Sequence, residues 1–161
     1  MRPFFLGLVL LVFLVIQATL VPLIAINGIR PDLLLIVVVS GALLLGKENG
    51  VGLGFFGGLL QDLASGNIFG LNIISKLATG YLAGVMERSV FKGNLLLPVL
   101  AVALATVFNG LVMLVILFVF GISFDLLVAL MNIGYLLVYN ALVAIPIHLI
   151  GCRIYSEWVI D

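Results

Sequence analysis

The sequence has few charged residues, one histidine and one cysteine, and each scarcity excludes a class of protein. Only 9% of its 161 residues are charged, against about a quarter in an ordinary soluble domain, so the chain lacks the polar surface that a water-soluble fold requires. Seven basic residues balance seven acidic ones, which leaves no excess positive charge for nucleic acid. The lone Cys152 cannot form an internal disulfide, and no Cys/His spacing indicates structural zinc.

Apolar residues dominate the rest of the chain. They make up 65% of it, and the mean hydropathy is +1.43. Because a helix needs about 20 residues to cross a bilayer, six crossings leave no room for a soluble domain. We therefore expect an all-α polytopic membrane protein, a six-helix transmembrane bundle that forms one integral membrane domain over residues 1–161. The expected spans are residues 3–26, 32–46, 50–64, 71–86, 95–120 and 126–151.

The distribution of basic residues predicts the orientation of the bundle. With six spans and a cytoplasmic amino terminus, only Arg30 lies outside, whereas the remaining loops and ends place their basic residues inside, as the positive-inside rule requires. The chain is then a multi-pass protein with both termini cytoplasmic. The middle spans are short, and a re-entrant pair there is an alternative that reduces the count to four. The expected cytoplasmic basic residues are Arg2, Lys47, Arg88, Lys92 and Arg153.

Glycines recur every four residues in the third expected span, and the fourth repeats the spacing. Small residues spaced in this way let helices approach closely in lipid, so we expect the third helix to lie centrally in the bundle. A glycine-lined ligand cavity or a seam for a partner protein are the alternatives. The candidate helix-packing or partner-contact residues are Gly46, Gly50, Gly54, Gly58, Asp62, Lys76, Gly80 and Gly84.

Asp62 and Lys76 are ionisable residues within expected spans. Such groups are costly in lipid and usually face the bundle interior beside a partner. If the third and fourth helices form a hairpin, Lys76 lies about one turn deeper than Asp62, and we expect the two to form a structural ion pair. Contact with a partner or ligand, and snorkelling of the lysine to the interface, are the alternatives.

The sequence contains no recognisable set of residues for catalysis or metal binding. His148 and Cys152 are spaced i,i+4, but two ligands do not make a metal site. Ser65 and Ser75 have no base beside them, because the only histidine lies at the far side of the expected membrane. We therefore expect no enzyme, no metal and no cofactor.

Polar side chains in the last two spans need hydrogen-bond partners, since lipid offers none. The fifth and sixth helices are expected to supply these to each other, and a polar pocket is the alternative. The residues concerned are Asn109, Asn132, Tyr135, Tyr139 and Asn140.

Several motifs follow one another in residues 30–86. Pro-Asp-Leu opens the second span at Pro31, and a Gly-Phe-x-x-Gly-Leu-x-x-Asp stretch runs from Gly54 to Asp62 and leads to Ser-Gly and then Gly-Leu. In order and spacing this series resembles the MreD family of rod shape-determining proteins. The family-motif positions carried over to this chain are Pro31, Asp32, Asp62, Ser65, Gly66, Gly70 and Gly84.

The resemblance implies a function in the bacterial inner (cytoplasmic) membrane. It implies a non-enzymatic scaffold or regulator of cell-wall elongation that maintains rod shape. The implied partners are MreC, in direct contact, and an elongation complex that includes MreB, RodA and a class B penicillin-binding transpeptidase of peptidoglycan synthesis.

The family is also similar in fold to the substrate-binding membrane subunits of energy-coupling-factor transporters. This similarity gives an alternative function, that of a small-molecule-binding subunit of such a transporter. Those subunits often dock through small residues in the first helix, but here Gly7 and Ala18 lie far apart and no Ala-x-x-x-Ala is present. The departure favours the cell-wall function.

Overall fold

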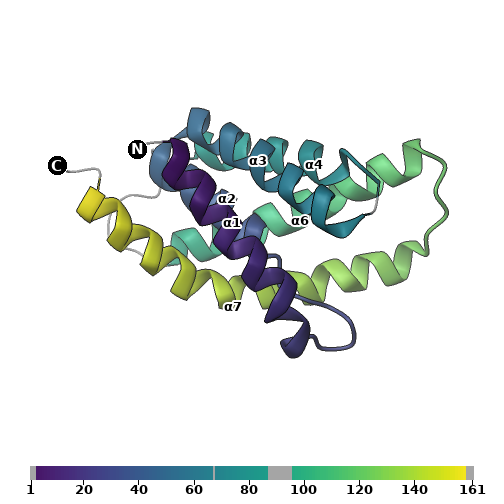
Figure 1. The fold of residues 1–161 in the computed structure, drawn as a ribbon. Helices are drawn as coiled ribbons and strands as arrows, with labels where there is room; N and C mark the ends of the chain where they lie inside the picture. Colours follow the sequence, from purple (N-terminus) through teal and green to yellow (C-terminus); the bar gives the residue numbers. More distant parts are fainter. Residues whose placement is uncertain (1–2, 67, 87–95, 159–161) are drawn as a thin grey trace.

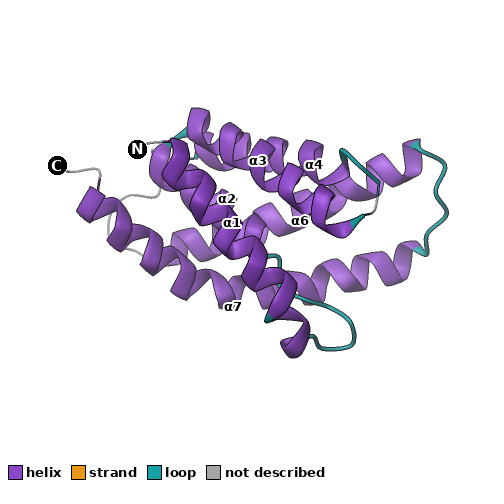
Figure 2. Cartoon of the chain, in the orientation of Figure 1, coloured by secondary structure: helices purple, strands orange, loops and turns teal. Residues whose placement is uncertain are grey.

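The computed structural model describes residues 3–66, 68–86 and 96–158, which form six α-helices, one short 3-10 helix and no strand (Figures 1 and 2). The all-helical architecture agrees with the expected fold class. The helices are α1 (Pro3–Thr19), η1 (Val21–Ile24), α2 (Leu33–Leu45), α3 (Lys47–Ser65), α4 (Leu71–Val85), α6 (Leu96–Val119) and α7 (Leu126–Trp158).

The helix boundaries differ from the expected segments near both ends of the chain. The first expected span continues to residue 26, but α1 ends at Thr19 and the chain passes into η1. Pro22 lies in η1 and has no backbone N–H with which to continue an α-helix. The chain then turns through Asn27 and Gly28, which both have positive φ angles. At the other end, α7 continues to Trp158 instead of ending at residue 151.

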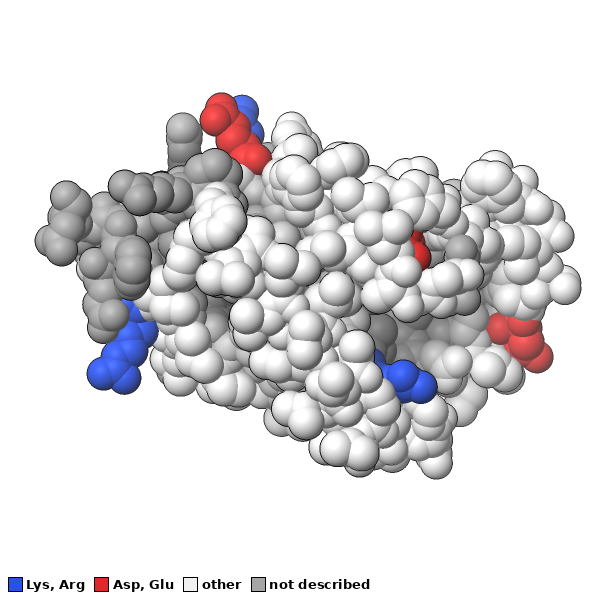
Figure 3. Space-filling view, in the orientation of Figure 1, with Lys and Arg blue, Asp and Glu red and all other residues white. Residues whose placement is uncertain are grey.

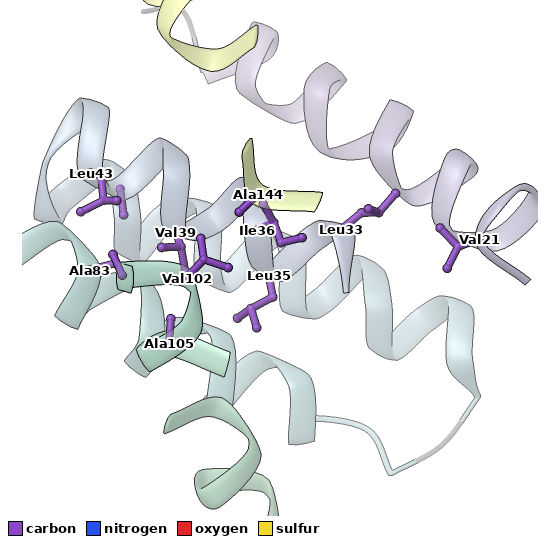
Figure 4. Packing of buried hydrophobic residues seen from close by; sticks show 12 residues of the cluster. Val21, Leu33, Leu35, Ile36, Val39, Leu43, Ala83, Val102, Ala105 and Ala144 are labelled. Carbon is purple, nitrogen blue, oxygen red and sulfur yellow. The ribbon is translucent and has the colours of Figure 1, made fainter. Parts of the chain in front are cut away.

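The central helix of the bundle is α2, and this corrects the expectation that the third helix lies there. Every residue of α2 except Gly41 and Leu45 is buried, whereas α3 buries mainly its glycine face. A helix that is apolar on all sides is stable only when neighbours surround it or lipid does, and here α1, α3, α4, α6 and α7 all pack against α2. Ile36 and Val39 of α2 meet Val102 of α6 and Ala144 of α7 in the core (Figure 4).

The outer surface of the bundle is apolar, as a helical membrane protein requires. Two helices, α6 and α7, are long and apolar enough to cross a membrane, while α1 and α2 are apolar but shorter. Large apolar side chains on the outside include Phe4, Leu23 and Phe118, each more than three-quarters exposed. On the face drawn in Figure 3, charged side chains are few and white residues cover most of the surface. Soluble monomers rarely expose apolar surface of this extent.

The two ends of the bundle differ in shape. The beginning of α1, the turn between α2 and α3 and the end of α7 lie at one end, on the left of Figure 1. The turn between α3 and α4 lies towards the other end, and the connection between α6 and α7 extends farther still (Figure 1). With about 1.5 Å of rise per residue, α6 is about 36 Å long and α2 only about 20 Å.

Candidate functional site

Helices α3 and α4 form a close antiparallel pair in which glycines of α3 face the backbone of α4. A Cβ atom added at Gly58 would lie 2.5 Å from the carbonyl oxygen of Asn72, and one added at Gly54 would overlap the carbonyl of Lys76. Gly50 and Gly80 face each other in the same way, so neither position has room for a side chain. The spacing of four residues thus places backbone against backbone along the pair.

The last two glycines of the sequence pattern lie at the other end of this pair. Gly46 joins α2 to α3 and has a φ of 85°, a conformation that favours glycine. A Cβ added at Gly84 would overlap the Cα atom of Lys47 at the start of α3. Both glycines therefore act at the tight junction of α2, α3 and α4, so Gly84 lies away from the other motif residues, which are at the opposite end of the bundle.

Asp62 binds the amino-terminal end of α4 from the end of α3. Its Oδ2 accepts the backbone N–H groups of Gly70 at 2.9 Å and Ile73 at 3.2 Å. Its Oδ1 accepts the backbone N–H and the side-chain amide of Asn72, at 3.1 and 2.9 Å. Because all four contacts are donated to it, the ionised form, which only accepts, satisfies every one. Asp62 thus supplies the helix cap that Gly70, the N-cap residue of α4, cannot provide.

The left-handed glycines of the motif make this geometry possible. Gly66 ends α3 with a φ of 63°, and Gly70 precedes α4 with a φ of 98°. Residues other than glycine rarely adopt this backbone conformation. The two glycines therefore let the chain reverse and bring its N–H groups back to Asp62. Ser65, the remaining motif residue in the turn, is exposed.

Lys76 forms an ion pair with Asp32, and the expected pair between Lys76 and Asp62 is wrong. The ammonium Nζ lies 2.6 Å from Asp32 Oδ2, and the lysine side chain is fully buried. Asp32 Oδ1 meanwhile accepts the backbone N–H of Leu35 at 3.0 Å and so caps α2. Asp62 has no oxygen left for the lysine, because four N–H groups already occupy it. Lys76 therefore reaches the next carboxylate, at the beginning of the central helix.

Asn72 connects the two carboxylates. Its amide nitrogen donates to Asp62, and its Oδ1 accepts from Lys76 Nζ at 3.5 Å. Lys76 in turn binds Asp32, so the motif residues at the start of α2 and those in the α3–α4 turn belong to one buried polar network. Low polarity around such a network strengthens each contact and makes any unpaired member costly.

The network continues into α1, α6 and α7. The backbone N–H of Asp32 donates to Asn140 Oδ1 at 2.9 Å, and Asn140 Nδ2 donates to Thr106 Oγ1 at 3.0 Å. From α1, Gln17 Oε1 accepts the backbone N–H of Leu34 at 3.0 Å. Asn140 and Thr106 agree with the expectation that the last two spans satisfy each other, and they also bind the beginning of α2. Pro31, which precedes this helix, is buried.

The other polar residues of the last two spans have different environments. Asn132 and Tyr135 are exposed on α7, and the hydroxyl of Tyr139 donates to the carbonyl oxygen of Ile24. Asn109 is buried at 3% exposure, its amide nitrogen reaches only Met113 Sδ at 3.7 Å, and its Oδ1 has no hydrogen-bond partner.

A recess of about 490 Å³ opens beside this network, between α1, the 28–32 segment, α3, α6 and α7. Its walls carry polar groups from α1, the 28–32 segment, α3, α4 and α6, and two amide oxygens among them, Gln61 Oε1 and Asn109 Oδ1, are buried without a partner. Buried amide oxygens without donors are uncommon in folded proteins, and water or a molecule that enters the recess can supply the donors. The polar side chains in the lining are Gln17, Arg30, Asp32, Gln61, Ser65, Asn72 and Asn109.

Of the residues considered for catalysis or metal binding, Ser65 lines the recess, whereas Ser75, His148 and Cys152 are not in its lining. Cys152 is half-buried, and the described part of the chain contains no group of three or more His, Cys, Asp or Glu residues that could hold a metal ion. Ser75 is buried and donates to the carbonyl oxygen of Asn72. Three of the expected cytoplasmic basic residues, Arg2, Arg88 and Lys92, lie outside the described residues.

Sequence reasoning missed the importance of Asn72, Gln17 and Gln61. Asn72 lies four residues before Lys76 and therefore on the same helix face, a signal that could have identified it as a neighbour of the lysine. Gln17 and Gln61 are isolated polar residues in apolar segments, a pattern that predicts an interior contact but not which one. Their positions become meaningful only when α1, α3 and α6 surround one recess.

The family comparison agrees with the motifs that build this site. The model of the family described as rod shape-determining protein MreD matches residues 1–155 of the chain. No curated protein and no solved structure matches the chain, so the expected fold similarity to energy-coupling-factor subunits has no support from these comparisons. The family match includes every motif residue of the network, and the chain belongs to the MreD family of rod shape-determining membrane proteins.

Proposed function

We propose that the chain is a non-enzymatic scaffold or regulator of the bacterial cell-wall elongation machinery and that it associates with MreC. The match to the MreD family over residues 1–155 carries this proposal. MreB, RodA and a class B penicillin-binding transpeptidase complete the proposed complex of peptidoglycan synthesis. The apolar surface of the bundle supports a place for the protein in the inner membrane, where a partner with a membrane span meets it directly.

The recess lies on the outer side in the orientation that we propose. The end of the bundle that carries both chain termini is then cytoplasmic, as are Lys47 and Arg153, while Arg30 lies outside. The recess is lined by Gly28, Arg30 and Ser65, which belong to the outward turns. It therefore opens towards the side on which MreC, as a single-span protein, continues beyond the membrane.

We propose that MreC contacts the recess, because two hydrogen-bond acceptors in its walls have no donor in this chain. Gln61 Oε1 and Asn109 Oδ1 are buried without partners, and hydrocarbon chains of lipids cannot donate to them. A polypeptide segment carries one backbone N–H per residue and can supply both donors from a short stretch. The ion pair of Lys76 and Asp32 holds the wall of the recess in place, so the partner meets a preformed surface.

Substitution of the unpaired amides tests this assignment. Asn109→Leu removes an unsatisfied acceptor, so we expect the isolated protein to keep its thermal stability, because loss of an unpaired polar group costs little. Binding of MreC is expected to fall at least about tenfold, as expected when a site built for donors loses its acceptor. The measurement is the amount of MreC retained on affinity-purified protein in mild detergent, together with cell width in a rod-shaped host that lacks its own copy.

Asn132→Leu is the matched control, since Asn132 is exposed on α7 and is not in the lining of the recess. It should retain MreC and rod shape. If Asn109→Leu and Gln61→Leu both retain normal amounts of MreC, the recess is not its contact. If no form of the protein retains MreC, and depletion of the protein leaves cell width unchanged, the proposed role in elongation is wrong.

The recess also supports the second candidate function, a small-molecule-binding subunit of an energy-coupling-factor transporter. Its volume of about 490 Å³ is in the usual range of small-molecule sites, about 300 to 1,000 Å³. The same purification separates the two functions. Recovery of a coupling subunit with two ATPases, in place of MreC, would favour the transporter.

A further inference from the structure

The α1–α2 loop, residues 20–32, extends from the side of the bundle at the lower end of α1 (Figure 1). It contains η1 and a tight turn in which Ile26 and Ile29 each donate a backbone N–H to the carbonyl oxygen of the other. Its large apolar side chains are exposed, with fractions of 80% for Leu23 and 62% for Ile26. Leu20 and Ile24 are also more than half exposed. The outer surface of the loop is therefore apolar.

The length of α1 places this loop within the outer leaflet of the membrane in the proposed orientation. The helix has 17 residues and is about 26 Å long, whereas the hydrocarbon core of a bilayer is about 30 Å thick. It also runs obliquely to α6 and α7 (Figure 1), so it covers still less of the membrane depth. If α1 begins at the cytoplasmic surface, its other end lies short of the outer surface. The apolar side chains of the loop are then at a depth where lipid surrounds them.

The backbone of the loop is hydrogen-bonded as a segment in lipid requires. Lipid offers no partners, so backbone polar groups there must be paired within the protein. The N–H groups of Leu20, Leu23 and Ala25 donate to carbonyl oxygens three or four residues earlier, at 2.9 to 3.4 Å. The carbonyl oxygen of Ile24 accepts from the hydroxyl of Tyr139 on α7. The loop thus combines exposed apolar side chains with a backbone that needs few partners from outside.

Hydrogen-bond donors are concentrated at the tip of the loop. Asn27 and Gly28 form the turn, with φ angles of 52° and 81°, and both are exposed, as is Arg30. Within the described residues, neither the backbone N–H groups of this turn nor the Arg30 guanidinium makes a hydrogen bond, and no acidic side chain pairs with Arg30. Consecutive N–H groups in a turn bind anions, and a guanidinium binds phosphate through paired hydrogen bonds. The tip therefore offers donors for a phosphate next to apolar side chains.

We propose that the α1–α2 loop binds an anionic phospholipid of the outer leaflet. Leu23 and Ile26 lie among the acyl chains, and the guanidinium of Arg30 binds the phosphate together with N–H groups of the turn. An anionic headgroup is preferred to a zwitterionic one, whose ammonium group has the same charge as Arg30. Gly28 and Arg30 also line the recess, so the bound lipid supports one of its walls. The proposal holds whichever molecule the recess binds.

Quenching of tryptophan fluorescence by brominated lipids tests the proposal. Trp158→Phe removes the only tryptophan, and Leu23→Trp in that background is the probe. The full chain is reconstituted into phosphatidylcholine vesicles that contain the same small fraction of either brominated phosphatidylglycerol or brominated phosphatidylcholine. We expect both lipids, brominated in mid-chain, to quench the probe. Phosphatidylglycerol should be enriched about fivefold at the probe, the factor that one basic residue near an anionic surface contributes.

Three variants serve as comparisons for this probe. Arg30→Gln should lower the enrichment of phosphatidylglycerol to about one and leave quenching by phosphatidylcholine unchanged, because the apolar contact remains. Lys47→Gln is the matched control, since Lys47 is an exposed cation at the opposite end of the bundle, and it should leave the enrichment unchanged. Ser123→Trp replaces Leu23→Trp as a probe outside the hydrocarbon, because α6 before it is already about 36 Å long. It should be quenched far less.

Three results would overturn the proposal. If neither lipid quenches the Leu23→Trp probe, the loop lies in water or against another protein. If both lipids quench it equally, the loop touches acyl chains but has no site for an anionic headgroup. If Arg30→Gln and Lys47→Gln lower the enrichment equally, the enrichment reflects the total charge of the protein and not a site at the tip of the loop.

Discussion

Asp32 and Asp62 each cap a helix, yet only Asp32 also binds a cation. Asp62 receives four N–H groups, which occupy both of its oxygens. Asp32 receives one backbone N–H on Oδ1, so Oδ2 is available to Lys76. Removal of either member of a buried ion pair leaves the other charge uncompensated, which typically costs about 3 to 5 kcal/mol. At the scale of single residues, the network therefore depends on both partners together.

A double substitution measures this dependence. Asp32→Asn keeps a side chain that caps α2 well but removes the counter-charge of Lys76. Lys76→Met leaves Asp32 without its cation. We expect each single variant to lower the free energy of unfolding by about 3 kcal/mol or more and the double variant to be more stable than either, because no lone charge remains. The variants are compared by thermal unfolding in mild detergent, and the quantity measured is the fraction of protein that stays monodisperse.

The pair Asp62→Asn with Lys76→Met is the control for this cycle. Asp62 does not bind the lysine and shares only Asn72 with it, so Lys76→Met should not rescue Asp62→Asn as it rescues Asp32→Asn. If Lys76→Met rescued Asp62→Asn but not Asp32→Asn, the result would favour the ion pair predicted from the sequence and contradict the observed one.

The choice between the two carboxylates could not be made from the sequence. A buried lysine was certain to need a partner, and Asp62 lay close to it in sequence, but N–H groups at the start of α4 compete for Asp62. That competition depends on the left-handed turn at Gly66 and Gly70, which fixes where the N–H groups point. Asp32 lies 44 residues from Lys76, and only the packing of α2 against α4 brings them together.

At the scale of helices, the glycine pattern predicted a close contact but not which helix is central. Gly54 and Gly58 serve one neighbour, α4, and leave Phe55 and Phe56 exposed on the other side of α3. The signal for the central helix was present in α2 instead, where apolar residues cover every face. In a membrane protein this signal is ambiguous, because lipid covers an apolar helix as well as protein does. Only the packing of the neighbouring helices shows that α2 is the central helix.

Gly54 and Gly52 provide a matched test of the α3–α4 contact. A Cβ at Gly54 overlaps the backbone of Lys76, whereas one at Gly52 meets nothing within 4 Å. Gly54→Ala should therefore destabilise the protein by about 1 to 3 kcal/mol, because the two backbones must move apart. Gly52→Ala should stabilise it by up to about 1 kcal/mol through helix propensity. Melting temperatures in one detergent that shift in the same direction for both variants would contradict the close contact.

At the scale of the whole molecule, the sequence predicted a helical membrane protein from its scarcity of charge, but not the recess. The recess lies between α1, the 28–32 segment, α3, α6 and α7, helices that are brought together only by the fold. Gln61 and Asn109, the two unpaired amides, come from helices that are not neighbours in sequence. Their depth relative to each other follows from the unequal lengths of α3 and α6, which composition and periodicity do not determine.

The proposed orientation predicts which residues a membrane-impermeant thiol reagent reaches. In a variant with Cys152→Ser, single cysteines at three exposed positions, Ser65, Ser123 and Ser156, report on the α3–α4 turn, the α6–α7 connection and the end of α7. With six crossings and cytoplasmic termini, Ser65→Cys and Ser123→Cys should react in spheroplasts and Ser156→Cys only after lysis. A re-entrant α3–α4 pair protects Ser65→Cys alone, because the turn then stays within the membrane. The inverted topology exchanges all three results, and the recess would then face the cytoplasm, where the outer segment of a single-span partner cannot reach it.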